Sequence, residues 1–480
     1  MAKIVVIGAG FAGHTAALYL GDALGKDHNV TMISESDRFS YVPSWVWVGV
    51  GHMDVGKTRF PLKPVYNKSR VNLVHGLATE VHPDAENQFV VVQRRDKPGE
   101  TINVPYDYLV IATGPKLNFE ATPGLGPDIG NTYSICTAGH AVQTRDKFLE
   151  TVERMKRGER QKIVVGTGHP GATCQGAAFE YITNVHKSLV KRGVRDKADL
   201  LYLSNERAVG DFGVRGVHVR KSDKLLTSED FLKALFKEYD TQWAVQRGVT
   251  GVEPGKVYWQ DYEGNDGETD FDFAMLIPQF TGRPLKFTGA NGEDVSGKVV
   301  AKNGLVLVDA HYGLPYEEMA ANPDTWPAVY RNPSYKNIFA AGIAFAPPGP
   351  ISVPHTNPKG MSIAAAPPRT GMVSGIIGRI VAKNIIDLVK HGRMTHSERM
   401  SEMSAACIAS MGDSLWDGSA AVIVVYPVVP DFRKYPNEQG RDMFVTDMEM
   451  GLAGAWMKRM IHTTFMHKLQ GRVGWKLIPE

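Results

Sequence analysis

The sequence predicts an α/β protein with two Rossmann-like dinucleotide-binding domains and a C-terminal region that associates with a membrane surface. Three observations predict this arrangement. A glycine-rich motif occurs at 3–13 (KIVVIGAGFAG) and again at 162–171 (KIVVGTGHPG), each time after a short apolar run. Two similar strand-like segments, 108–114 and 337–343, lie far apart in the chain. Apolar and basic residues follow one another with helical spacing over 456–476.

Length and composition exclude several classes of protein. A chain of 480 residues exceeds what one hydrophobic core usually supports, so more than one domain is expected. The net charge is only +3, so no nucleic-acid partner is expected. The longest apolar run, Ala420–Val429, is much shorter than the ~20 residues that cross a bilayer. The first apolar run is too short for the apolar region of a signal peptide, so no secretory signal is expected in it. The sequence therefore predicts a folded protein that does not span a membrane.

The first glycine motif predicts a site for a dinucleotide. Gly8 permits a tight turn, Gly10 lets the backbone approach a pyrophosphate, and Gly13 allows close packing of helix on sheet. The helix that follows presents free N–H groups at its N-terminus. The second strand, Asn29–Ser34, ends where an acid usually binds the ribose. Ser34 and Glu35 stand there, and the sequence leaves open which of them has this role.

The later strand ends favour FAD over NAD at this first turn. Ala112-Thr113-Gly114 closes one strand, and Gly342 closes another. This pattern is typical of flavoenzymes with two dinucleotide folds, in which the glycine brings the backbone near the flavin diphosphate. An aspartate usually follows that glycine, whereas this chain has Ile343.

The same strands predict the domain bounds. The chain is expected to leave the first domain near Leu117 and to return to it near Thr281. The predicted domains are a discontinuous FAD-binding domain at 1–120 and 285–395, a second Rossmann-like domain at 121–284, and a C-terminal region at 396–480.

The three cysteines, Cys136, Cys174 and Cys407, are too few and too far apart for a disulfide framework or a metal site, so no metal is expected. Each is either a core thiol or a redox participant. Cys174 stands out because the pattern puts it in the first turn of the helix after the second glycine motif, where the helix dipole stabilises a thiolate. The acid expected after the strand Leu200–Ser204 is slightly displaced, to Glu206. From the residues alone, a core thiol and a redox thiol remain about equally well supported.

The C-terminal helix is expected to be amphipathic. Its apolar face is expected to hold Trp456, Met457, Met460, Ile461, Phe465, Met466 and Leu469. Its basic residues are Lys458, Arg459, Lys468, Arg472 and Lys476. Such a helix suits the headgroup region of a bilayer, with apolar residues inserted and cations among the lipid heads. Packing of the helix against the protein core is the alternative.

Seven segments of the chain match one known family in order and spacing. They are GAGFAG at 8–13, YVPSWVWVGVG at 41–51, YDYLVIATGPKLNFE at 106–120, SICTAGHA at 134–141, GATCQGAAFEY at 171–181, KNIFAAGIAFAPP at 336–348 and CIASMGD at 407–413. On these segments the chain resembles the sulfide:quinone oxidoreductases over nearly its whole length.

The resemblance implies site residues. Cys174 and Cys407 would face each other beside the flavin and carry the growing sulfur chain, and Cys136 would be a third, less essential cysteine. His140 could move protons near neutral pH, although a structural histidine is at least as well supported.

The expected cofactor-binding residues are Gly8, Gly10, Phe11, Ala12, Gly13, Ser34, Glu35, Val42, Pro43, Ala78, Ala112, Thr113, Gly114, Gly342 and Ile343. The expected quinone-binding residues are Arg369, Gly371, Ile408 and Phe465. Lys116 and Arg369 could also stabilise negative charge on reduced flavin or quinone. The sequence departs from the family at Asp211, where a histidine is expected, and at Ile408, where a phenylalanine is common.

The activity that the resemblance implies is oxidation of sulfide to polysulfide or elemental sulfur, with two electrons passing through FAD to a membrane quinone. Hydrosulfide would attack a Cys174–Cys407 bridge, leaving Cys174 as the persulfide carrier and Cys407 as the thiolate that faces the flavin.

The expected partners are sulfide, a quinone and a membrane lipid surface, at the membrane of a bacterial or archaeal cell. A homo-oligomer is left open. The alternatives are a type II NADH:quinone dehydrogenase, the flavoprotein subunit of flavocytochrome c sulfide dehydrogenase, a coenzyme A-disulfide reductase, and a non-catalytic FAD-stabilised partner protein.

Overall fold

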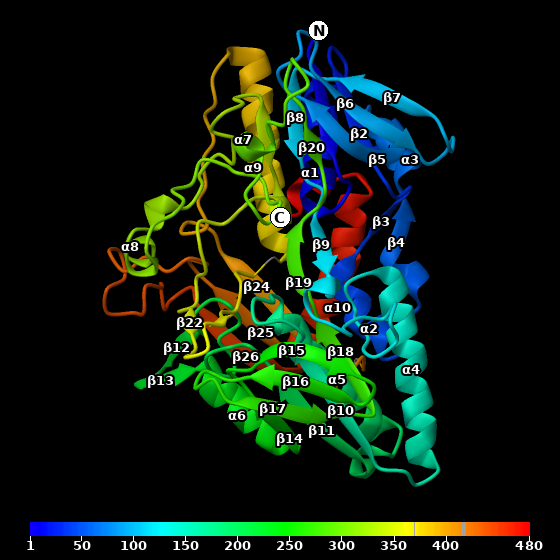
Figure 1. The fold of residues 1–480 in the computed structure, drawn as a ribbon, viewed down its shortest axis with the longest axis vertical. Helices are drawn as coiled ribbons and strands as arrows, with labels where there is room; N and C mark the ends of the chain where they lie inside the picture. The colour runs from blue at the N-terminus through cyan, green and yellow to red at the C-terminus, as the bar shows by residue number, and fades with distance from the viewer. Residues whose placement is uncertain (369, 415, 417) are drawn as a thin grey trace.

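The computed structural model describes residues 1–368, 370–414, 416 and 418–480. Two sheets dominate it, one at each end of the long axis (Figure 1). The first sheet has the strand order β21-β8-β1-β2-β5-β6-β7, with β20 beside β5. Its strands are β1 (Lys3–Ile7), β2 (Asn29–Ser34), β5 (Asn72–His82), β6 (Phe89–Arg94), β7 (Thr101–Pro105), β8 (Tyr108–Ile111), β20 (Lys286–Phe287) and β21 (Ile338–Ala340).

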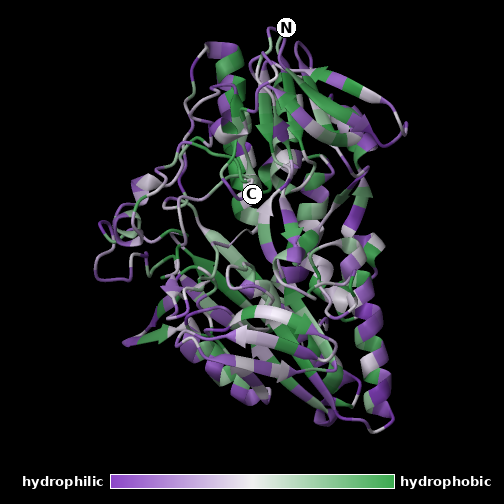
Figure 2. Cartoon of the chain, viewed as in Figure 1, coloured by the Kyte–Doolittle hydropathy of each residue, from purple (hydrophilic) through white to green (hydrophobic). Residues whose placement is uncertain are grey.

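The centre of the first sheet is parallel and buried on both faces. β1 pairs in parallel with β2 and β8, and β21 pairs in parallel with β8. Unbroken apolar runs such as the one in β1 are typical of strands covered on both sides, and Figure 2 shows these strands as hydrophobic. Two helices, α1 (Phe11–Leu24) and α9 (Gly371–His391), pack against each other over this sheet. The late strand β21 therefore joins the first sheet, as the sequence predicts.

The second sheet is smaller and entirely parallel, with the order β14-β11-β10-β18. Its strands are β10 (Gln161–Thr167), β11 (Ala198–Leu203), β14 (Thr241–Ala244) and β18 (Phe273–Ile277). Its helices are α4 (Ala138–Lys156), α5 (Gln175–Lys191) and α6 (Ser228–Glu238). An antiparallel sheet of β15 (Gly248–Glu253), β16 (Lys256–Gln260) and β17 (Asp266–Asp270) follows.

Two short strands carry the chain between the two units. β9 (Pro115–Asn118) and β19 (Gln279–Gly282) pair antiparallel, with Phe280 opposite Leu117. The chain thus passes between the units at the two points that the sequence predicts, although the domain bounds themselves remain a prediction.

The C-terminal region forms a third sheet of β24 (Ala405–Met411), β25 (Ser419–Val425) and β26 (Asp447–Gly451), followed by α10 (Leu452–Leu469). β24 packs against α5 of the second unit. The remaining elements are β3 (Arg38–Ser40), α2 (Trp45–Gly49), β4 (Arg59–Pro61), α3 (Leu62–Ser69), β12 (His218–Lys221), β13 (Lys224–Thr227), α7 (Ser296–Val299), α8 (Tyr316–Ala321), β22 (His355–Thr356), β23 (Ser362–Ile363) and short 3-10 helices, among them Val42–Ser44 and Gly342–Ala344.

Helix α10 differs from the expected interfacial helix in two of its lysines. Lys458 is buried and pairs with Glu180 at 2.9 Å, and Lys468 is buried and pairs with Glu480 at 2.8 Å. The prediction that these lysines lie among lipid heads is wrong, because each ammonium neutralises a buried carboxylate inside the protein. Leu469 is also buried, so the C-terminal end of the helix packs on the core. Among the described residues, no helix has the length and apolarity to span a bilayer.

Candidate functional site

The first glycine turn combines tight packing with one open face. Gly8 has φ +100°, and a Cβ atom there would lie 2.3 Å from the carbonyl oxygen of Ala112. A Cβ atom at Gly13 would lie 1.9 Å from the carbonyl oxygen of Gly8. A Cβ atom at Gly10 would meet no protein atom within 4 Å. Because α1 begins directly after Gly10, its first N–H groups lack helical partners and face this open side. The turn fits an anionic diphosphate.

The other predicted glycines gather around the start of α1. Gly114, with φ +68°, follows β8. A Cβ atom at Gly342, which has φ +64°, would lie 2.7 Å from the Cβ of Ala12. A Cβ atom at Gly371, the first residue of α9, would lie 3.3 Å from the ring of Phe11. Segments from the beginning and the end of the chain thus form one cradle.

The remaining cofactor candidates come from four separate segments of the chain. Thr113 adjoins Gly8, and Ile343 follows Gly342 in a 3-10 helix. Val42 and Pro43 begin another 3-10 helix, and Val42 is exposed. Ala78 is buried in β5. Their contacts with a cofactor remain a prediction.

At the end of β2 the two ribose candidates have different surroundings. The hydroxyl of Ser34 is buried and donates to the carbonyl oxygen of Ser36 at 2.7 Å. The carboxylate of Glu35 is exposed and accepts from Arg95 at 2.8 Å and from Arg283 at 3.2 Å. The choice between Ser34 and Glu35 stays open.

Cys174 and Cys407 come together from distant parts of the chain. Cys174 immediately precedes α5 rather than lying in its first turn, and its backbone is left-handed with φ +66°. Cys407 lies in the strand β24. A Cβ atom at Gly176, in the first turn of α5, would lie 3.7 Å from Sγ of Cys407. Cys407 and Cys136 are each half-buried in this structure.

Burial keeps two of the thiols protonated at neutral pH. It raises the pKa of Cys407 to about 11, with Glu180 adding to the rise and Lys458 opposing it. Burial also raises the pKa of Cys136 to about 12, against the hydrogen bond from Ser134. A thiolate at Cys407 therefore needs compensating positive charge, and Lys458 is a cation that lowers the pKa of this thiol.

A buried polar cluster next to Cys407 was not among the predicted site residues. Glu180, on α5, accepts from the backbone N–H of Ser410 at 2.9 Å and from its hydroxyl at 2.5 Å. Its second oxygen accepts from Lys458 at 3.1 Å. A glutamate inside the apolar run AAFEYI was the signal for it in the sequence.

His140 reaches Cys136 through a serine. Nδ1 of His140 lies 3.3 Å from Oγ of Ser134, and this oxygen accepts from the backbone N–H of Cys136 at 3.1 Å. Burial lowers the pKa of His140, so the ring is mainly neutral at pH 7. Asp211, at the position of the family histidine, is buried, accepts hydrogen bonds from Ser352 and Gly213, and has its pKa raised by burial.

The residues predicted for the quinone side are less closely grouped. Arg369 lies outside the described residues. Ile408 is buried on the face of β24 opposite Cys407, since neighbouring strand residues alternate. Phe465, on α10, is half-buried against the hydrophobic core around the first sheet. Lys116 pairs with Glu120 at the surface, so its predicted role beside the flavin finds no support in its contacts.

A second unpredicted contact joins α10 to the loop before α2. Nδ1 of His462 lies 2.8 Å from Oγ of Ser44, and the His462 ring meets Tyr41 edge-on at 5.2 Å. Tyr41 in turn contacts Phe11, at 5.5 Å between ring centroids. These contacts link α10 to the cradle.

Within the part of the chain that the structure describes, the second glycine turn has no open face comparable to the first. Helix α5 begins at Gln175, after the motif ends. A Cβ atom at Gly168 would lie 2.8 Å from the side chain of Leu125. The backbone N–H of Ala364 donates to the carbonyl of Pro170 at 3.1 Å, so a later loop lies on the turn.

The carboxyl group of Glu206, the displaced acid after β11, is already engaged in hydrogen bonds within the protein. Glu206 is fully buried and accepts from Tyr202 and Ser204 at 2.7 Å each and from the backbone N–H of Phe212 at 2.8 Å. Burial raises the pKa of Glu206 to about 7. Its carboxyl group is therefore unavailable to a ribose.

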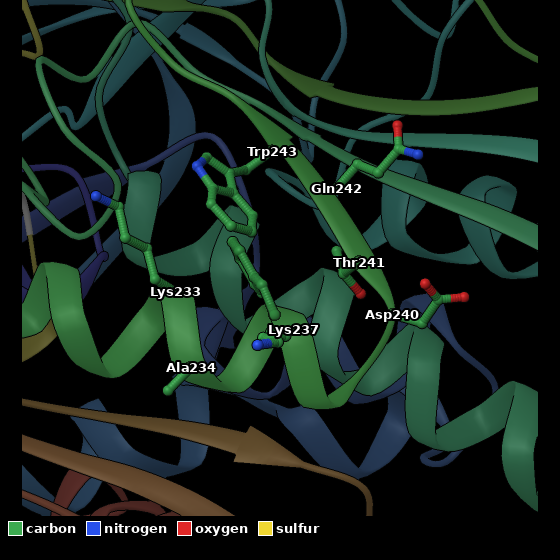
Figure 3. A pocket seen from close by; sticks show the side chains of 8 residues that line it. Lys233, Ala234, Lys237, Asp240, Thr241, Gln242 and Trp243 are labelled. Carbon is green, nitrogen blue, oxygen red and sulfur yellow. The ribbon is translucent and has the colours of Figure 1, made fainter.

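A surface cavity of about 420 Å³ lies elsewhere, between α6 and β14. Figure 3 shows Lys233 and Lys237 of α6 and Trp243 of β14 around it. Its lining includes none of the predicted site residues.

Comparisons with known proteins agree with this geometry. The family described as pyridine nucleotide-disulphide oxidoreductase matches residues 2–312. A sulfide-quinone reductase of Aquifex aeolicus is 30% identical over 92% of this chain and 87% of its own length. The chain belongs to the sulfide:quinone oxidoreductase family. The crystal structure of the Aquifex aeolicus sulfide:quinone oxidoreductase superposes with a TM-score of 0.76 at 28% identity, over 98% of this chain and 92% of that chain.

More distant matches agree with the fold. NDH2 of Plasmodium falciparum has a TM-score of 0.64 at 12% identity, over 99% of this chain and 97% of that chain, which is a likeness of fold alone. Family membership confirms the predicted α/β fold with Rossmann-like units and the assignment as a flavin-dependent oxidoreductase.

Proposed function

We propose that this protein oxidises sulfide to polysulfide or elemental sulfur with FAD and passes two electrons to a membrane quinone. The observation that carries the proposal is the meeting of Cys407, from β24, with the start of α5 beside Cys174. This pair is connected to the cradle, because the backbone N–H of Ala406 donates to the sulfur of Met372 near the start of α9.

FAD is proposed for the cradle around Gly10. The open face at Gly10 and the N–H groups at the start of α1 fit its diphosphate, and Gly114 and Gly342 allow close approach of the backbone. When bound, FAD supplies a two-electron acceptor. The protein contributes binding, orientation and the electrostatic surroundings of the thiols.

The sulfur chemistry is assigned to the two cysteines in their oxidised, bridged state. Hydrosulfide attacks Sγ of Cys174, forming a new S–S bond as the bond to Cys407 breaks, and the electron pair of that bond leaves as the Cys407 thiolate. Lys458 stabilises this negative charge, whereas burial and the Glu180 carboxylate both disfavour it. In the net reaction one hydrosulfide, one proton and one quinone give one zero-valent sulfur and one quinol.

The filled second turn argues against NADH as the electron donor. Leu125 and the segment at Ala364 pack against this turn, and Glu206 is buried. Stopped-flow mixing tests the choice: sulfide is expected to bleach the flavin absorbance within seconds, whereas NADH leaves it unchanged. Bleaching of the flavin absorbance by NADH in the absence of sulfide would refute the proposal.

Membrane contact is proposed for the start of α10 and the segment after it. Trp456, Met457 and Met460 are exposed on α10, and Val473 and Leu477 are exposed beyond it. Exposed basic residues, Arg472 and Lys476, lie in the same segment. Apolar side chains flanked by cations suit an interface of anionic lipids, from which a quinone can enter. The proposed location is peripheral, at a bacterial or archaeal membrane.

The domain assignment is part of the same proposal. FAD binding is assigned to 1–120 and 285–395, delivery of sulfur to 121–284, and the quinone and membrane side to 396–480.

A further inference from the structure

The end of β11 has an unusual occupant. In a dinucleotide-binding unit the second strand ends at an acid that binds a ribose. Here Asn205 follows that strand, and it is fully buried. Its side-chain amide donates to the carbonyl oxygens of Pro170 at 2.9 Å and Ala172 at 3.1 Å. Its own carbonyl oxygen accepts from the side chain of Gln175 at 2.9 Å.

These bonds hold both ends of the segment that carries Cys174. Pro170 and Ala172 precede the cysteine, and Gln175 follows it as the first residue of α5. The Gln175 amide also donates to the carbonyl of Ala172 at 3.0 Å, which closes a ring of side-chain and backbone hydrogen bonds. One carboxamide therefore ties together the approach to the cysteine and the helix that leaves it.

The backbone of Cys174 needs such support. Its φ of +66° and ψ of 35° place a non-glycine residue in the left-handed region, which L-residues avoid. Conformations of this kind persist only where the surroundings enforce them. On the other side of the segment, Thr173 donates to the carbonyl of Pro367 at 2.9 Å. Asn205 supplies the hydrogen bonds on the β11 side.

We propose that Asn205 is a positioning residue that holds the Cys174 thiol in register with Cys407. The place where related units recognise a nucleotide serves here to fix a redox cysteine. This inference rests on the proposed function, since it assigns Asn205 to the sulfide half of the reaction and not to the quinone half.

The substitution Asn205→Asp tests the inference. It keeps the size of the side chain and the acceptor for Gln175, but it replaces the amide donor with a carboxylate oxygen facing three carbonyl oxygens, those of Pro170, Ala172 and Ala364. The matched control is Asn332→Asp. Asn332 is also fully buried and donates to the carbonyl oxygens of Leu307 at 2.9 Å and Lys298 at 3.3 Å, in a loop of the first unit.

Both half-reactions are measured by stopped flow on FAD-loaded protein. Reduction of the flavin by sulfide is expected to slow by at least about tenfold in Asn205→Asp relative to Asn332→Asp, because small displacements of a reacting group cost on the order of 10²-fold. Reoxidation of dithionite-reduced protein by a soluble ubiquinone analogue is expected to stay within about twofold of the wild type. A purely structural defect would slow both steps.

A second variant, Asn205→Ala, removes the donor without adding a charge and is expected to show the same split. Wild-type rates of reduction by sulfide in either folded variant would overturn the inference. Loss of bound FAD from both variants would also overturn it, because a role confined to the cysteine segment leaves the first glycine turn intact. If sulfide fails to reduce the wild-type protein, the proposed function itself fails, and that result is distinct from the others.

Discussion

Replacing Lys458 by methionine leaves the carboxylate of Glu180 buried without its ammonium partner. The two groups lie 2.9 Å apart with side-chain exposures of only 9% and 7%. Removing one partner of such a pair costs about 3–5 kcal/mol. The hydrogen bonds from Ser410 to Glu180 remain in the variant, so we expect the lower end of this range, about 3 kcal/mol.

The double variant Lys458→Met/Glu180→Gln removes both charges and keeps an acceptor for Ser410. We expect it to be more stable than Lys458→Met alone, with a coupling of about 2 kcal/mol. The control is Lys233→Met, which breaks an exposed pair with Glu229 (48% and 43% exposed, 2.6 Å apart) and should cost about 0–1 kcal/mol.

The measurement is thermal unfolding. Only the order of the melting midpoints of the variants is compared, because a chain with several units need not unfold in two states. Lys458→Met should melt about 5 °C or more below the wild type, and the double variant should melt between them. A midpoint for Lys458→Met within about 1 °C of the wild type, or a double variant less stable than the single one, would refute charge compensation in this cluster.

The same substitution has a chemical readout at Cys407. Burial raises the pKa of this thiol and Lys458 lowers it, so Lys458→Met should shift the pH profile for its alkylation by iodoacetamide to higher pH. The profile of Cys136, for which Lys458 is not a cause of the shift, is the internal control.

Three further predictions concern other parts of the molecule. Gly10→Ala should reduce FAD binding while leaving the apoprotein stable, because the new methyl group meets no protein atom. Gly8→Ala should impair folding as well as FAD binding. FAD titration and melting of the apoprotein distinguish the two variants. Burial raises the pKa of Glu206 from 4.5 to about 7, so the folded state holds a proton that the unfolded state loses, and stability should fall by roughly 3 kcal/mol as the pH rises from about 4.5 to above 7. Glu206→Gln should flatten that pH dependence of the melting temperature, and an unchanged slope would contradict the assignment. Replacing Trp456 and Met460 by serine should weaken sedimentation with anionic vesicles without changing reduction by sulfide, and undiminished sedimentation would argue against membrane contact there.

The parts of the fold that follow from local sequence were predicted well. Gly8, Gly10 and Gly13 determine a turn whose geometry depends on neighbours only a few residues away. The strand Asn29–Ser34 has the predicted bounds, and Leu117 and Thr281 lie in the two strands that pair between the units. Apolar runs of strand length between turn residues specify such elements without long-range information.

For the cysteine site, the sequence predicted which residues take part but not their geometry. The sequence and its resemblance to a family indicated Cys174 and Cys407, but not the left-handed backbone of Cys174 or its support by Asn205. Those features depend on contacts between segments far apart in the chain. A pattern of residues carries no direct record of such contacts.

Sequence by itself therefore determined the two Rossmann-like units and the glycine turn before α1, because short-range stereochemistry decides them, whereas the redox role of Cys174 and Cys407 stays a prediction from the family resemblance. Tertiary structure decided the rest. It buried Lys458 against Glu180 rather than leaving it at a lipid surface, and it filled the second glycine turn with residues such as Leu125. The physical reasons differ: desolvation penalises an unpaired charge, so the buried Glu180 carboxylate requires a cationic partner, whereas burial of apolar side chains fills the space beside the second turn.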